Sequence, residues 1–214
     1  MGIVQPLKAA TVRREALAHL EELPGWANTV IGDLLSEVDR LDERIAQYDR
    51  HIALMARQST QAQQLMQLAG IGETTATALI STVGGGHDFA SGRSCSAWLG
   101  LVPGQYSSGG KQRLGRITKA GDSYLRSLLV MGARAVLAAA MNTRTLKQDP
   151  ISRWARSLAE RRGYWRAVVA IAAKNARLCR AVLQRGEGYK MPACSQSQQK
   201  QHEQQNSKDQ STTA

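Results

Sequence analysis

Residues 31–55 carry the pattern that most limits how this chain can fold. Large apolar residues recur there at alternating steps of three and four: Ile31, Leu34, Val38, Leu41, Ile45, Tyr48, Ile52 and Met55. This spacing is the a/d pattern of a coiled coil, kept over more than three heptads with charged residues between. One amphipathic helix packed on its own domain is the alternative, but a strict repeat without drift favours a helix–helix partner. We therefore expect a homo-oligomer that forms through residues 31–55.

The remainder of the chain also favours helices. No segment of useful length alternates apolar and polar residues, so we expect an essentially all-α fold. Further helices are expected at about 91–99, 122–141, 150–161 and 164–185. The expected domains are a linker remnant at 1–25, a coiled-coil segment at 26–58, a helical DNA-binding domain at 62–190 and a disordered Gln-rich tail at 191–214. The tail is too polar to bury a core.

The charge is divided unevenly along the chain. The formal net charge is +11, yet residues 1–92 hold 7 Lys and Arg against 11 Asp and Glu. Residues 93–190 hold 19 Lys and Arg against 4 Asp and Glu. A segment with this excess of positive charge predicts a polyanionic partner, and nucleic acid is the commonest one. The alternative is a basic surface that is only solvated.

The cysteine, histidine and apolar content of the chain argue against a zinc-binding protein and against a membrane protein. Three distant cysteines and four scattered histidines form no zinc-binding pattern, and we expect no metal or cofactor in this chain. Reduced thiols predict a cytoplasmic protein. The longest apolar run, 125–141, is interrupted by Arg126 and Arg134, so no membrane partner is expected. The few aromatic residues, Trp98, Trp154 and Trp165 among them, are expected to anchor the core or its edge rather than stack on bases.

A glycine-rich turn joins two apolar segments at 65–85, LMQLAGIGETTATALISTVGG. Gly70 and Gly72 with the following Ala76 resemble a helix-hairpin-helix motif. Glycines there permit positive φ and close approach of the backbone to a phosphate, which amides at the start of the second helix then bind. The alternative is an ordinary helical turn capped by glycine.

The strongest candidate site is the loop GQYSSGGKQRLGRITKAGDSYLR at 104–126. A serine there can attack a DNA phosphodiester and hold the strand as a phosphoserine. Cations would stabilise the charge that develops on the phosphoryl oxygens. We expect catalysis from Ser108 or Ser107, and nucleic-acid binding from Lys111, Arg113, Arg116, Lys119 and Arg126 together with Gly70 and Gly72. By residue spacing alone, a glycine-rich basic loop that binds phosphate without catalysis is commoner than a catalytic loop.

Three segments together resemble a known family: LAGIGETTATALIS, then FASGRSCSAWLGLVPGQYSSGGKQRLGRITKAGDSYLRSLLVMGARAVL, then AVVAIAAKNARLCRAVL. They look like the C-terminal half of a bacterial insertion-sequence transposase of the one-ten family, eleven-eleven subgroup, related to Piv-type DNA invertases. The resemblance covers about residues 1–190 and is most specific over 96–135. It implies a serine nucleophile, and Ser108 is favoured because relatives with one serine keep the one directly before glycine. It also implies a coiled coil between protomers and a structured guide (bridge) RNA that pairs with DNA.

The same resemblance implies a RuvC-like domain whose D-E-D-D carboxylates bind a divalent metal such as Mg²⁺. No such carboxylate pattern occurs here, since the acids at 33–49 lie on the coiled-coil stretch. We therefore expect a partial transposase that binds DNA but is inactive without that domain. The rival hypothesis is a non-catalytic nucleic-acid-binding remnant that forms mixed oligomers with full-length transposase and inhibits it. A helix-hairpin-helix repair accessory protein is disfavoured, because the resemblance extends far beyond the hairpin.

Overall fold

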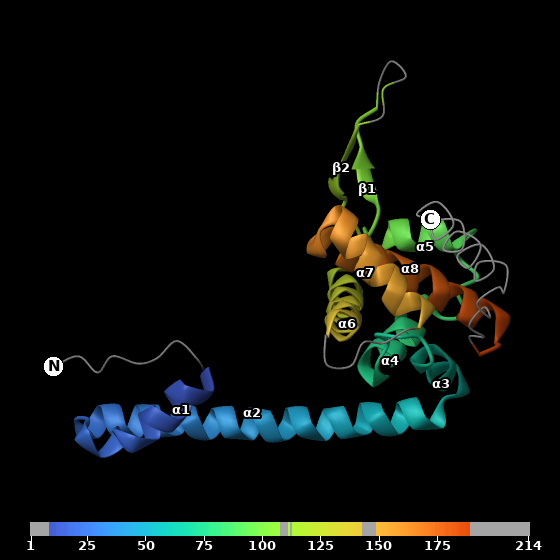
Figure 1. The fold of residues 1–214 in the computed structure, drawn as a ribbon. Helices are drawn as coiled ribbons and strands as arrows, with labels where there is room; N and C mark the ends of the chain where they lie inside the picture. The colour runs from blue at the N-terminus through green and yellow to red at the C-terminus, as the bar shows by residue number, and fades with distance from the viewer. Residues whose placement is uncertain (1–8, 108–110, 112, 143–148, 189–214) are drawn as a thin grey trace, which may run out of the picture. The chain divides into compact units, whose positions relative to one another are not determined.

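The computed structural model describes residues 9–107, 111, 113–142 and 149–188 (Figure 1). The described chain is predominantly helical, which confirms the all-α expectation, with one small two-stranded sheet that the sequence did not predict. It divides into two compact units, Met1–Leu54 and Met55–Ala214. The expected tail at 191–214 lies outside the described residues.

In the first unit a short helical segment lies back along a long helix. Helix α1 (Ala9–Ala18) and the 3₁₀ turn η1 (Leu20–Glu22) precede α2 (Gly25–Gln58). The side-chain amide of Asn28 donates to the Leu20 carbonyl at 2.9 Å and holds the turn between them. Arg13 of α1 bonds Asp42 of α2 at 2.7 Å, and this exposed pair contributes little to stability.

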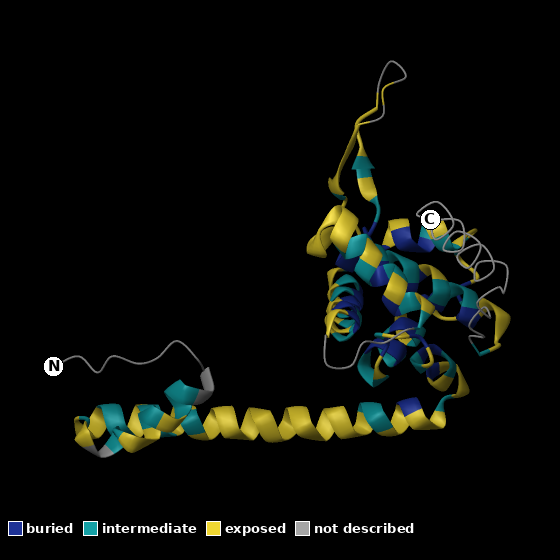
Figure 2. Cartoon of the chain, viewed as in Figure 1, coloured by how far each residue is buried: buried dark blue, intermediate teal, exposed yellow. Residues whose placement is uncertain are grey.

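Helix α2 keeps its apolar seam in solvent. The helix coincides with the expected segment 26–58, but Leu34, Ile45 and Met55 on the seam are 60%, 58% and 63% exposed. Figure 2 shows the middle of this helix exposed along its length. Apolar side chains on a solvated helix are typical of an interaction surface. Pairing with a second helix stays a prediction.

The second unit has its core between α6 (Ser123–Met141), α7 (Pro150–Arg162) and α8 (Tyr164–Arg185), which pack on one another. Helix α5 (Gly92–Trp98) packs on α8 as well. Helix α6 is long and apolar enough to cross a membrane by length and composition alone. Its wholly buried residues, however, form one stripe within this core: Leu125, Leu129, Ala133, Leu137 and Ala140.

The helices begin where the sequence provides an N-terminal cap. Asp122 accepts a hydrogen bond from the Leu125 amide at 2.9 Å, and Asp149 accepts one from the Ser152 amide at 3.0 Å. Ser91 and Ser94 form a reciprocal capping box at the start of α5. Each cap satisfies an amide that the helix leaves unpaired, which explains why the predicted boundaries of these helices were close.

A glycine contact joins the helix pair α3 (Thr60–Met66) and α4 (Glu73–Val83) to α6. A Cβ added to Gly132 of α6 would lie 1.9 Å from the Gly70 carbonyl oxygen, in the turn between α3 and α4. Gly70 itself has φ +86°, which favours glycine. From α8, the buried Asn175 donates to the Ala69 carbonyl at 2.9 Å. The turn is thus fixed from two sides by backbone contacts.

We expect Gly132→Ala to lower the free energy of unfolding by about 3 kcal/mol, because the new methyl group must displace backbone. Gly72→Ala is the matched control, since a Cβ there meets nothing within 4 Å. Its cost should stay below about 1 kcal/mol. Urea unfolding followed by circular dichroism measures both, and equal losses would contradict the close contact.

Candidate nucleic-acid interface

The serines follow the first strand of a β-hairpin whose two strands project from the helices of the second unit (Figure 1). Strand β1 (Pro103–Gln105) pairs antiparallel with β2 (Leu114–Ile117), with Pro103 opposite Ile117. The register is irregular between Pro103 and Gln105. The pairing extends one step further, because the Tyr106 amide donates to the Arg113 carbonyl at 2.9 Å.

The base of the hairpin is locked against the end of α5. The Thr118 amide donates to the Val102 carbonyl at 2.9 Å, and the Lys119 amide donates to the Gly100 carbonyl at 3.1 Å. A Cβ on Gly121, at φ +74°, would lie 1.8 Å from the Trp98 carbonyl oxygen. Lys119 has φ +56°, a conformation that costs energy for a residue with a side chain. The chain therefore reverses here in a backbone-to-backbone contact that tolerates no side chain at Gly121.

Arg126 holds this reversal in place. Its Nη1 donates to the carbonyl oxygens of Leu99 at 3.2 Å and Ala120 at 3.0 Å, and more weakly to that of Asp122 at 3.5 Å. These bonds join α5, the loop and the start of α6 through one half-buried guanidinium. The geometry gives Arg126 a structural role, whereas its expected contact with nucleic acid stays a prediction.

Ser107 and Ser108 differ in what the structure describes of them. The Oγ of Ser107 accepts a hydrogen bond from the Gln105 side-chain amide at 3.0 Å and another from the Arg113 amide at 3.2 Å. Both lone pairs of this hydroxyl are therefore engaged, and the bond from the Arg113 amide joins the β1 side of the hairpin to the β2 side. Ser108, Gly109 and Gly110 lie outside the described residues.

An aromatic ring covers the stem of the hairpin. Tyr106 is 77% exposed, and its ring lies beside the two glycines that face each other on the strands. A Cβ on Gly115 would meet this ring at 3.3 Å, and one on Gly104 would meet it at 3.6 Å. The glycines thus make room for the Tyr106 ring as well as lending flexibility.

The expected phosphate-binding cations are available to solvent. Lys111, Arg113, Arg116 and Lys119 are all exposed. Within the described part of the chain none of these four forms an ion pair. Unneutralised cations on a projecting hairpin are suited to binding phosphates. His87, the nearest histidine in sequence, is exposed in the loop after α4 and makes no hydrogen bond to the described part of the hairpin.

The two glycines of the suspected helix-hairpin-helix differ in their surroundings. Gly70 is packed against α6, as described above. Gly72 is exposed, with open space where a Cβ would stand, at the start of α4. Only Gly72 therefore presents free backbone to a phosphate in this conformation, and DNA contact at this turn stays a prediction.

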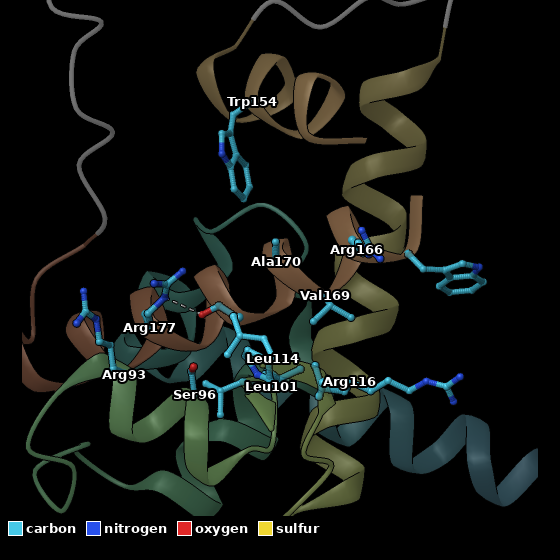
Figure 3. A pocket seen from close by; sticks show the side chains of 16 residues that line it. Arg93, Ser96, Leu101, Leu114, Arg116, Trp154, Arg166, Val169, Ala170 and Arg177 are labelled. Atoms are coloured by element: carbon cyan, nitrogen blue, oxygen red, sulfur yellow. Dashed lines mark hydrogen bonds between the residues drawn. The ribbon is translucent and has the colours of Figure 1, made fainter. Parts of the chain in front are cut away.

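Sequence reasoning did not select three arginines that flank the root of the hairpin. Arg93 of α5 and Arg166 and Arg177 of α8 line one groove with Arg116 of β2 (Figure 3). They come from separate elements, so no motif of adjacent residues marks them. The excess of basic residues over 93–190 was the available signal.

The two described cysteines are not candidates for nucleophilic chemistry. Cys95 and Cys179 are buried and free of a disulfide. Burial raises the pKa of both thiols above the ordinary value, far above it for Cys179, so neither forms a thiolate near neutral pH. Among the residues that the structure describes, no three His, Cys, Asp or Glu side chains are grouped to hold a metal ion.

We expect Arg126→Ala to lower the free energy of unfolding by about 2 kcal/mol, since it leaves part-buried carbonyls without their donor. Arg116→Ala is the matched control, and its exposed side chain should change stability by less than about 0.5 kcal/mol. Chemical denaturation of the two variants measures the difference. If Arg126→Ala weakened DNA binding with no loss of stability, a direct contact would replace the structural role.

Comparison with known proteins gives a consistent family assignment. Residues 62–148 match the family model described as "Transposase IS116/IS110/IS902 family". The chain is 42% identical over 168 residues to a "Probable family 20 transposase" of Pseudomonas aeruginosa, covering 78% of this chain and 48% of the relative. It is 40% identical over 194 residues to the "Transposase for insertion sequence element IS1111A" of Coxiella burnetii, covering 86% and 52%.

A third relative, the "Transposase for insertion sequence element IS1328" of Yersinia enterocolitica, is 37% identical over 137 residues, covering 64% of this chain and 41% of the relative. The chain spans about half the length of the curated relatives it matches. The matched segment includes the glycine turn, the hairpin and α6. Residues 62–148 are thus similar to the transposase domain that the IS116/IS110/IS902 family model describes.

Proposed function

We propose that this chain acts in DNA transposition and recombination, with Ser108 as the nucleophile that attacks a DNA phosphodiester. The observation that carries the proposal is the projecting hairpin, whose first strand is followed closely by the serines and which carries four exposed cations between its far part and its base. Within the described chain these cations, Lys111, Arg113, Arg116 and Lys119, have no ion-pair partner. The relatives' names, all transposases, support the same class of reaction.

The chemical step is a transesterification. The Oγ of Ser108 forms a bond to phosphorus while the bond from phosphorus to one deoxyribose oxygen breaks. The serine proton passes to a base or to water, and the departing oxygen takes up a proton to become a hydroxyl. The phosphoserine keeps the energy of the broken ester bond for rejoining the strand. Lys111 and Arg113, which follow the serines, would neutralise the charge that grows on the non-bridging oxygens. Arg116, nearer the root of the hairpin, would contact a phosphate farther along the strand.

The hydrogen bonds of Ser107 favour its neighbour as the nucleophile. A hydroxyl oxygen that already accepts two hydrogen bonds has its lone pairs engaged, and attack on phosphorus requires a free lone pair. Ser107 then acts as a positioning residue that fixes the loop end to both strands. This assignment agrees with the preference of the family for the serine directly before glycine.

The partners follow from the same family resemblance. DNA is the proposed substrate, a structured guide RNA its proposed selector, and a second copy of the chain would pair through residues 31–55. The carboxylates of a RuvC-like domain would hold the divalent metal. The described residues of this chain do not form such a carboxylate set, so that domain has to be provided outside them. A binding remnant that inhibits full-length transposase is the alternative, and covalent chemistry distinguishes the two.

We expect Ser108→Ala to abolish a covalent protein–DNA adduct and to leave DNA affinity nearly unchanged, because one hydroxyl adds little to binding beside several cations. Ser107→Ala should reduce the rate of adduct formation by roughly ten- to a hundred-fold. The nucleophile Ser108 is still present in this variant, but it is no longer held in position by the hydrogen bonds of Ser107. The measurement is a denaturing gel of end-labelled element DNA. The full chain is combined with guide RNA and with the part of the Pseudomonas aeruginosa relative that this chain does not match.

The double variant with alanine at both positions is the control for background adduct. A covalent band that persists in the double variant would exclude both serines as nucleophiles. No band from the wild-type mixture, with DNA binding intact, would favour the inhibitory remnant.

We expect Leu41→Asp combined with Ile45→Asp to dissociate the oligomer, because two charges would be buried in the seam. The paired control Asp42→Ser and Glu43→Ser changes two neighbouring acids of α2 that lie off the seam. Analytical ultracentrifugation of the full chain gives the oligomeric state. Sedimentation unchanged by the aspartate pair would remove this seam as the interface.

A further inference from the structure

A groove of about 990 Å³ lies at the root of the hairpin and is distinct from the serine loop at its end. Its size is within the range of sites for small organic groups. Figure 3 shows Trp154 of α7 on one side, facing Leu101 and Leu114 on the other. Val169, Ala170 and Ala173 of α8 form the floor between them. The small floor residues leave a slot with apolar walls.

The ends of the groove carry positive charge. Figure 3 places Arg93 and Arg177 toward one end and Arg116 and Arg166 toward the other. All four are exposed, and no Asp or Glu is among the residues that line the groove. Cations at both ends of an apolar slot match a planar, weakly polar group joined on each side to an anion. A nucleotide within a strand has this chemistry, since its base lies between two phosphates.

Trp165 provides an accessible aromatic face on the lining. It is 64% exposed, so of the two expected positions, core or edge, it occupies the edge. Arg134 lies over its ring at 5.7 Å, and the Tyr164 ring meets it edge-on at 5.3 Å. These contacts hold the indole in one orientation while most of its surface stays in solvent. A preoriented, exposed indole is suited to stacking on an unpaired base.

The apolar lining also distinguishes between kinds of strand. The walls and floor are mostly aliphatic and aromatic, and the one serine among the lining residues, Ser96, is only 3% exposed. A 2′-hydroxyl pressed against such a surface would lose its water without gaining a partner. Deoxyribose carries no such group, so the lining favours DNA over RNA. A duplex would not fill the groove, because its bases are paired and stacked.

We propose that this groove binds an unpaired base of single-stranded DNA, with Trp165 as the stacking surface and the arginine pairs on the flanking phosphates. The proposal rests on the proposed function, since it presumes that this unit binds DNA. It adds a subsite for a strand that has left its duplex.

The test compares a fluorescein-labelled thymidine 12-mer with an abasic 12-mer of the same length, using anisotropy with the full chain at about 150 mM salt. The wild type should bind the thymidine strand at least about ten-fold more tightly, because only that strand can stack. Trp165→Ala should reduce this preference to near unity. Trp26→Ala, an equally exposed tryptophan in the first unit, should retain it.

A second substitution, at another residue of the groove, tests the same proposal in case Trp165→Ala does not fold. Ala170→Trp fills the slot without removing charge and should also remove the preference for bases. Arg166→Ala should weaken both strands alike, whereas Arg162→Ala, an exposed arginine off the groove, should weaken them less. Thermal unfolding by circular dichroism verifies that each variant is folded.

The outcomes separate this inference from the proposed function. A folded Trp165→Ala or Ala170→Trp that keeps the full base preference overturns the subsite, as does a wild type without any preference. A uridine 12-mer that binds as tightly as the thymidine strand, and loses affinity equally in Trp165→Ala, overturns the assignment to DNA. Failure of the wild type to bind duplex DNA at about 50 mM salt would instead overturn the proposed function itself.

Discussion

The backbone contact between the end of α5 and the loop at 118–121 determines where the hairpin and its exposed cations lie. Gly121 approaches the Trp98 carbonyl so closely that no side chain fits, and Arg126 joins the same carbonyl-rich corner to α6. Strand β1 begins at this corner and strand β2 ends there. The geometry of the corner therefore sets the direction in which the hairpin projects. The groove depends on the same corner, since Leu101 and Arg116 line it from either side of the hairpin root. The rigid support and the projecting hairpin therefore depend on the same backbone contact.

Much of the helical fold could be predicted from the sequence. The 3–4 repeat gave α2, and the capping residues Asp122 and Asp149 bound the helices that follow them. The hairpin could not be found in this way. Its strands are three and four residues long, rich in glycine and largely exposed, so they have no apolar alternation to detect. Their pairing depends on the contact at Gly121 and on the Ser107 hydroxyl, which are tertiary features.

The candidate site was predictable to the extent that it is local in sequence. Lys111 and Arg113 stand next to the serines, so a motif identified them. Arg93, Arg166 and Arg177 belong to helices that converge only in the folded unit, and Trp165 could be classed only once its exposure was known. Charge counting over 93–190 indicated that such residues existed but not which of them share a surface. A motif can also mislead. Arg126 lies in the basic segment and was therefore predicted to bind nucleic acid, yet in the structure it donates hydrogen bonds to backbone carbonyls.

The separation between groove and serine constrains how the two could act on one strand. Strand β1 runs from the groove, at Pro103, toward Ser107, about four residues or roughly 13 Å of extended chain. That length exceeds the rise of about 3.4 Å per nucleotide along the axis of a duplex several-fold. A base held in the groove therefore belongs to a different nucleotide from the one whose phosphate meets Ser108. In this proposal the groove sets the register of the DNA strand. It would hold one nucleotide at the root of the hairpin, and the length of the hairpin would then determine which phosphate reaches Ser108.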